Sequence, residues 1–123
     1  NMLENIGKAT AYNDRRNVAV GGDVILFKTE SDVRFIAYLL NTKFHRRKII
    51  ALSQGVTIRH VYPSTFYNYE IEIPDTPEQT AIADMYMAID KEISLLKQLR
   101  DSLNEQKKGL MQKLLTGKIR VKV

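Results

Sequence analysis

A column of aliphatic residues that recurs every seven positions is the strongest constraint on what this chain can fold into. The column lies in the last third of the sequence and consists of Ile82, Ile89, Leu96, Leu103 and Leu110. A repeat of seven is typical of a helix whose apolar side packs against another helix. No proline follows Pro77 in the sequence, so no such residue interrupts a helix here.

Both ends of this helix carry recognisable signals. Thr76, Pro77 and Gln79 form a capping box, with Thr76 as the N-cap and Gln79 reaching back to it. Gly117 is suited to the position that ends the helix. We predict one helix from Pro77 to Leu115, a rod of about 58 Å at about 1.5 Å per residue. A preceding segment of about 75 residues has a radius of gyration of about 11 Å, so it cannot cover the rod.

The second apolar column of this helix is irregular. It passes through Met85 or Tyr86, Ile93, Leu99, Gln106 and Leu114. A strict column would contain the polar residues Glu92, Gln106 and Lys113, so the pattern favours an antiparallel or locally unwound helix pair over a long, regular two-stranded zipper. Burying an exposed Leu or Ile gains about 1.5–3 kcal/mol, so we expect a partner helix from a second copy or another protein. The predicted interface consists of Ile82, Ile89, Ile93, Leu96, Leu99, Leu103, Leu110 and Leu114.

The residues before this helix predict a small domain of the α+β class. Gly21–Asp23 has turn chemistry and precedes a short apolar run. A helix is predicted over Val33–Leu52, where apolar residues share one face. That face consists of Val33, Ile36, Ala37, Leu40 and Phe44. The predicted strands are Val24–Phe27, Val56–Ile58 and Tyr69–Ile73, the last from its two-residue alternation.

Three short strands and one helix make a thin core for an independent domain. Because Asn1 precedes Met2 and Ala9–Arg16 shows no clear period, we expect that part of the domain is missing. The predicted organisation is a partial domain over 1–75, a long coiled-coil helix over 76–117 and a basic tail over 118–123.

The excess positive charge of the chain lies at its C-terminal end. The net charge is +5. From Lys107 onward there are six basic residues and no acidic one, whereas the rest of the chain has 13 basic and 14 acidic residues. Such an end suits either a solvated helix terminus, whose cations complement the dipole, or a phosphate-binding tail. Charge alone leaves both interpretations open.

Catalytic and membrane functions find little support. The chain has no cysteine, no apolar run approaching about 18 residues and no signal peptide, so we expect a soluble, intracellular protein. Asp75, Glu105 and Lys107 formally match the acid and lysine set of metal-dependent nucleases. However, Glu105 and Lys107 stand two residues apart in a helix, so their side chains diverge by about 200°. No glycine-rich phosphate loop is present, and we expect no metal, no cofactor and no catalytic activity.

DNA binding is better supported, by two groups of residues around Gly55. The first, at the end of the predicted helix, consists of Lys43, His45, Arg46, Arg47 and Lys48. The second consists of Gln54, Thr57, Arg59 and His60. Lys and Arg at this density suit contacts with phosphates, and Gln, Thr and Arg can contact base edges. The alternative is a helix C-terminus enriched in cations, which complement the helix dipole. Composition alone does not decide between these interpretations, although both histidines are expected at the surface.

The order of several short motifs resembles that of type I restriction–modification DNA specificity subunits. The motifs are Gly22–Phe27, Gln54–Ile58, Ile71–Pro74, Glu78-Gln79, Ile82-Ala83, Ile89-Asp90, Ile93, Lys107–Gln112 and Leu114–Arg120. Each motif is weak, but together and in this order they are specific, and they cover most of the chain.

This resemblance implies a non-catalytic role. Subunits of this kind recognise double-stranded DNA through target recognition domains that are held apart by long helices in an antiparallel coiled coil. The helices also dock the methyltransferase subunits, and the restriction subunit joins the assembly. A full member has two such domains and two helices, so the resemblance also implies that this chain forms a homodimer through its helix. The alternative is a remnant that pairs with intact specificity or methyltransferase subunits without recognising DNA.

Overall fold

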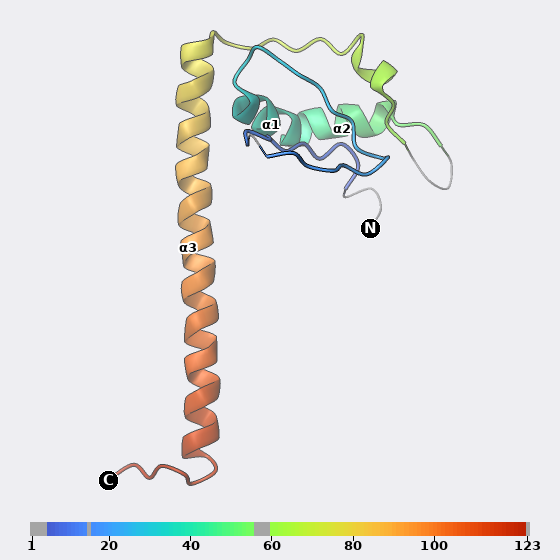
Figure 1. The fold of residues 1–123 in the computed structure, drawn as a ribbon. Helices are drawn as coiled ribbons and strands as arrows, with labels where there is room; N and C mark the ends of the chain where they lie inside the picture. The colour runs from blue at the N-terminus through green and yellow to red at the C-terminus, as the bar shows by residue number, and fades with distance from the viewer. Residues whose placement is uncertain (1–4, 15, 56–59, 123) are drawn as a thin grey trace. The chain divides into compact units, whose positions relative to one another are not determined.

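The computed structural model describes residues 5–14, 16–55 and 60–122. Their regular elements are helix α1 (Val33–Asn41), helix α2 (Lys43–Leu52), the short 3-10 helix η2 (Pro63–Phe66) and helix α3 (Thr76–Leu114) (Figure 1). The chain divides into two compact units, Asn1–Met85 and Tyr86–Val123. The first unit therefore includes the first turns of α3.

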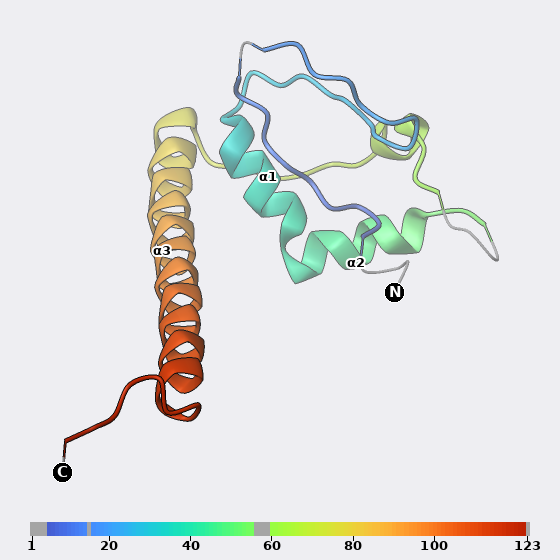
Figure 2. The ribbon, with the colours of Figure 1, turned by 60° about the horizontal axis from the view of Figure 1, so that its bottom comes forward.

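The residues predicted as one helix over Val33–Leu52 are helical apart from Thr42, but they form two helices, so the predicted continuity was wrong. Thr42 has an extended backbone between α1 and α2 (φ −60°, ψ 150°), and its side chain accepts a hydrogen bond from the N–H of His45 at 3.4 Å. The N–H of Thr42 meanwhile donates to the carbonyl of Leu39 at 3.0 Å. Thr42 thus ends one helix and caps the next, and Figure 2 shows the bend between them.

The core of the first unit is small and involves all three α-helices. Its buried members are Phe35, Ile36, Leu40, Ile49 and Ala83. Ile36 and Leu40 belong to the predicted apolar face of α1, whereas Phe44, predicted on the same face, is 61% exposed. The bend at Thr42 turns α2 onto a different axis, and the helical periodicity that placed Phe44 inside therefore stops before it.

The strands predicted at Val24–Phe27 and Tyr69–Ile73 are also wrong, and Val56–Ile58 lies outside the described residues. Within the described residues the backbone pairing between distant segments consists of one antiparallel bridge, Gln54 with His60, so the α+β class is not confirmed and the chain is mostly helical. Tyr69 and Ile71 nevertheless pack against the core, whereas Ile73, which continues the same alternation, is 41% exposed. A strand additionally needs a hydrogen-bonded neighbour, which side-chain alternation does not provide.

Helix α3 begins and ends close to the predicted positions, but its cap differs. The carboxylate of Asp75 accepts a hydrogen bond from the N–H of Glu78 at 3.0 Å, so Asp75 takes the role predicted for Thr76. Gln79 is buried, and its amide donates to the carbonyl of Pro74 at 2.7 Å. After Leu114, the positive φ of Gly117 (+73°) ends the helix as predicted.

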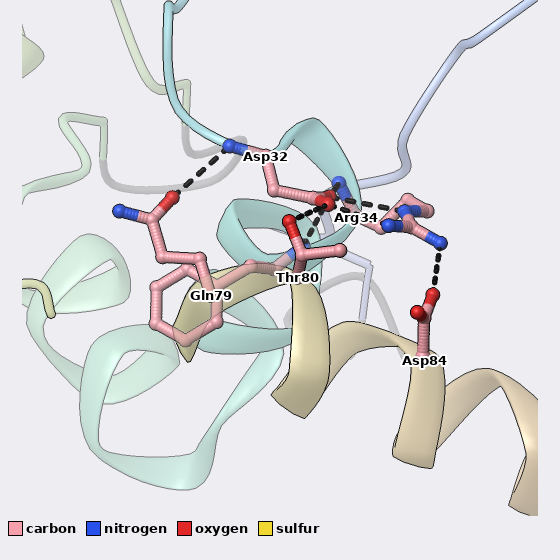
Figure 3. Close-up of polar contacts among 6 residues, drawn as sticks. Asp32, Arg34, Gln79, Thr80 and Asp84 are labelled. Atoms are coloured by element: carbon pink, nitrogen blue, oxygen red, sulfur yellow. Dashed lines mark hydrogen bonds and ion pairs between the residues drawn. The ribbon is translucent and has the colours of Figure 1, made fainter. Parts of the chain in front are cut away.

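A polar cluster joins the start of α1 to the first turns of α3 within the first unit. The Asp32 cluster consists of Asp32, Arg34, Gln79, Thr80 and Asp84 (Figure 3). The carboxylate of Asp32 accepts hydrogen bonds from the backbone N–H groups of Arg34 and Phe35, at 2.9 and 3.3 Å, and so caps α1. The Arg34 guanidinium contacts both acids of the cluster at 2.6 Å. The Gln79 oxygen accepts from the backbone N–H of Asp32 at 3.0 Å.

Candidate nucleic-acid interface

Helix α2 has a buried face and an exposed face of opposite character. His45 and Ile49, four residues apart, are buried in the first unit. Three cations lie on the exposed side, where residues separated by about four positions share a face. We call these three residues, Lys43, Arg47 and Lys48, the cationic face. The helix contains no acidic residue, so its own side chains do not neutralise this face.

The bend at Thr42 changes the interpretation of these cations. One long helix would have placed them near a C-terminus, where positive charge complements the dipole. In the structure Lys43 lies in the first turn of α2, where the dipole favours negative charge instead, and Arg47 and Lys48 lie in the middle of the helix, away from its C-terminus. The dipole therefore does not account for the cationic face, whereas an anionic partner would complement it.

Arg46 differs from the other basic residues of α2. Its side chain is half-buried, and a guanidinium nitrogen donates to the backbone carbonyl of Ile6 at 2.9 Å. Nearby, the Asn41 amide accepts from the Ala9 N–H at 3.2 Å and donates to the Ala9 carbonyl at 2.6 Å. Both side chains thus hold residues 6–9, which we call the N-terminal segment, against α1 and α2. Arg46 consequently has a structural role that the sequence did not indicate.

His45 is buried, so the expectation of a surface or phosphate-contacting position was wrong. A hydrogen bond of 2.7 Å joins its Nδ1 to the hydroxyl of Tyr69. Burial, together with the charge of Lys48, lowers the pKa of His45, and burial raises the pKa of Tyr69. Because the bend sets the phase of α2, the histidine points to the core while its basic neighbours point outward.

The second predicted group, Gln54, Thr57, Arg59 and His60, follows α2 in the chain. The backbones of Gln54 and His60 exchange hydrogen bonds of 2.9 and 2.8 Å, which close the loop at its base. Both side chains are exposed. Thr57 and Arg59 lie outside the described residues. The ring of His60 is 3.8 Å from the carboxylate of Asp23, so an acid lies beside this group.

The predicted helix interface divides between the two units. Ile82 is half-buried and packs against the core of the first unit. The other predicted positions lie in the second unit, where Leu96, for example, is 57% exposed. These exposed positions are Ile89, Ile93, Leu96, Leu99, Leu103, Leu110 and Leu114.

A comparison with protein families shows the family of this chain. The family model described as the type I restriction modification DNA specificity domain matches residues 4–105. This match covers most of the chain, including α1, α2 and much of α3. The chain belongs to this family. The resemblance inferred from the motifs is thereby confirmed.

Curated members of the type I specificity family align with most of this chain. The MjaVIII specificity subunit of a type I restriction enzyme from Methanocaldococcus jannaschii is 33% identical over 98 residues, which are 79% of this chain and 23% of the relative. The StySPI specificity subunit from Salmonella potsdam is 28% identical over 87 residues, 68% of this chain and 19% of the relative. The chain thus spans less than a quarter of the length of these relatives. No solved structure gives a significant match.

The residues of the nuclease alternative have other roles in this family member. Asp75 caps α3, and Glu105 forms an ion pair of 2.7 Å with Lys108 rather than with Lys107. Among the residues that the structure describes, no group of three or more His, Cys, Asp or Glu could hold a metal ion. In the same part of the chain, no helix has the length and apolar character needed to cross a bilayer.

Proposed function

We propose that this chain is a non-catalytic DNA-binding module of a type I restriction–modification system. In this role it directs methyltransferase and restriction subunits to a DNA sequence. Family membership supports the class of function, because the matching model is that of a DNA specificity domain. The observation that supports placing DNA binding on a particular surface is the cationic face of α2.

The cationic face suits a polyanion better than any other feature of the first unit. Lys43, Arg47 and Lys48 are exposed within six residues of one another, and α2 carries no acid. Lys and Arg supply the phosphate contacts that dominate DNA affinity. An α-helix also fits the major groove of B-DNA, which is about 12 Å wide. Gln54 and His60, both exposed after α2, are further candidates for contact with DNA, together with Thr57 and Arg59.

The salt dependence of binding to a pool of random-sequence duplexes tests this surface. Arg47→Ala should lower the slope of log K against log[salt] by about one, because one phosphate contact is lost. Arg46→Ala is the matched control, since its side chain binds the Ile6 carbonyl. It should lower stability in urea by about 1–3 kcal/mol through loss of a charged hydrogen bond, with little change in the slope. An unchanged slope for Arg47→Ala would exclude it from the interface.

We further propose that the exposed apolar side of α3 pairs with a second long helix in antiparallel orientation. Charge supports this orientation. Residues 76–96 carry four acids and one base, whereas residues 97–114 carry two acids and five bases. Antiparallel pairing places the acidic half of one helix beside the basic half of the other, which steers the pairing. Two copies paired in this way would present two recognition modules, as a two-fold symmetric dimer requires.

Light scattering after size-exclusion chromatography tests the pairing at tens of micromolar. The chain should elute as a dimer, and Leu96→Asp should give a monomer with the first unit still folded, because a charge would replace a buried side chain. Gln98→Asp, which changes the opposite side of the helix, should remain dimeric. A monomeric wild-type chain would contradict self-pairing.

Co-purification with a type I methyltransferase subunit tests the proposed role in the assembly. A stable complex that methylates duplex DNA at one defined sequence is the expected result. A stable complex without methylation would instead favour a partner that pairs through its helix without recognising DNA. The absence of any complex would contradict the proposed role in directing the methyltransferase.

A further inference from the structure

Phe44 is an exposed aromatic residue among the cations of α2. Its side chain is 61% exposed, although it lies directly after Lys43 and four positions before Lys48. By helical spacing it falls on the same outward side of α2 as the cationic face. Helix α2 therefore presents a large aromatic group among its cations; its other exposed large apolar residue, Leu52, lies in the last turn.

Two contacts hold the Phe44 ring in place. The Lys48 ammonium lies 4.5 Å from the ring centroid, within the range of a cation–π contact. On another side the buried His45 ring meets it edge to face, with centroids 5.1 Å apart and an interplanar angle of 87°. An ordered ring loses little conformational freedom on binding, so it is suited to a specific contact.

The surroundings of Phe44 indicate which kind of surface it contacts. A protein partner at this position would need acids to match Lys43, Arg47 and Lys48, whereas nucleic acid supplies phosphates for all three. When a helix lies in the major groove, one apolar group is available to it on the base edges, the 5-methyl group of thymine. Phenylalanine is among the side chains that make this contact.

We propose that Phe44 contributes sequence preference by packing against a thymine methyl group, while the cationic face holds α2 on the phosphates. This inference rests on the proposed function, because it requires that α2 lie in the major groove of duplex DNA. It assigns separate roles to neighbouring residues. The lysines and Arg47 supply affinity that is independent of sequence, and Phe44 supplies discrimination at one base pair.

Selection from random duplex pools tests this division of roles. The purified full chain is used to select from one pool containing thymine and from a second containing deoxyuridine, which pairs identically but lacks the methyl group. Loss of one buried methyl group lowers affinity about fourfold, so a preference of about fourfold for thymine should appear at one position and vanish in the deoxyuridine pool. Phe44→Ala should abolish the same preference in the thymine pool.

Two control variants make the result specific. Phe44→Leu keeps an apolar side chain and should retain part of the preference. Arg47→Ala should weaken binding to all sequences without changing the selected sequence, since it removes a phosphate contact and leaves both contacts of the aromatic ring. Far-ultraviolet circular dichroism should show the same helix content for all three variants, because both positions are exposed.

The outcomes separate this inference from the function on which it rests. A wild-type chain that selects a sequence which Phe44→Ala leaves unchanged would overturn the role of Phe44 but not DNA recognition. If the wild-type chain prefers deoxyuridine at the selected position as strongly as it prefers thymine, the methyl contact is overturned. It is also overturned if Phe44→Ala removes a preference at a different position. A wild-type chain that selects no sequence would overturn both proposals.

Discussion

Replacing Asp32 by asparagine should destabilise the first unit by about 2 kcal/mol at neutral pH. The carboxylate of Asp32 is almost buried, with 10% of its side chain exposed, and forms a 2.6 Å ion pair with Arg34. Asparagine caps helices about as well as aspartate, so the substitution retains the cap of α1 and removes the charge. The lost stability therefore measures the charge of Asp32, mainly through its bond with the Arg34 side chain and in smaller part through the backbone N–H groups at the cap.

The magnitude follows from the pKa of Asp32. The hydrogen bond from Arg34, supported by the backbone N–H groups at the start of α1, lowers this pKa from 3.8 to about 2. One pKa unit corresponds to about 1.36 kcal/mol, so the shift corresponds to about 2.4 kcal/mol. Because the native pKa is lowered, this stability is fully present above pH 3.8 and is lost as the pH falls towards 2. The partial exposure of Arg34 (26%) places the expected loss slightly below that figure.

Urea unfolding followed by near-ultraviolet circular dichroism of the tyrosines measures this loss. At pH 7 the midpoint for Asp32→Asn should fall with an unchanged m-value. The difference between variant and wild type should shrink as the pH falls from about 4 to about 2. Asp84→Asn is the matched control, since Asp84 contacts the same guanidinium but is 62% exposed and should cost less than about 1 kcal/mol. A pH-independent difference, or none at pH 7, would refute the reasoning.

Two further substitutions test other parts of the first unit. Gly7→Ala should destabilise it by about 2–4 kcal/mol, because Gly7 has φ +69° and a Cβ there would lie 2.6 Å from Cγ2 of the buried Ile49. Gly22→Ala, where a Cβ meets nothing within 4 Å, should change the free energy of unfolding in urea by less than about 0.5 kcal/mol. An equal effect of both substitutions would contradict the packing. Lys43→Glu should raise the free energy of unfolding by about 0.3–1 kcal/mol by placing an acid in the first turn of α2, and it should weaken binding to duplex DNA. Tighter or unchanged DNA binding would show that Lys43 does not contact DNA.

The sequence was most informative about α3. A seven-residue column, the absence of proline after residue 77 and a glycine at position 117 predicted a helix whose limits in the structure differ by one residue at each end. These signals are local, since periodicity and terminal residues act within one or two helical turns. The identity of the cap was harder to predict, because Asp75 and Thr76 are both good N-cap residues and adjacent in the chain.

The errors arose where a distant contact decides the local structure. The apolar periodicity over residues 33–44 predicted continuity, but Thr42 can cap a helix and the core favours two short helices over one. Val24–Phe27 has strand-like composition, yet it has no strand partner among the residues that the structure describes, and Leu26 is 72% exposed. Whether such a segment pairs depends on residues far away in the sequence, which composition does not encode.

The same bend explains why the candidate site could be found only in part. Composition placed the basic residues of α2 together but could not distinguish Arg46, which holds the N-terminal segment, from Arg47, which is exposed. Nor could it place His45 inside and Phe44 outside. Both distinctions depend on the phase of α2, and that phase is set by the bend at Thr42.

The contribution of the cationic face to the stability of α2 supports a role for these residues in binding rather than in folding. Lys43 lies in the first turn of α2, where the helix dipole disfavours positive charge, and Arg47 and Lys48 lie in the middle of the helix. No acid within the helix offsets these charges. Helix α2 is held instead by the Thr42 cap, by Ile49 in the core and by the bond between His45 and Tyr69. Lys43 thus opposes the stability of the helix that carries it. Binding of a polyanion would turn the same charges into a favourable contribution, as expected for a member of a DNA specificity family.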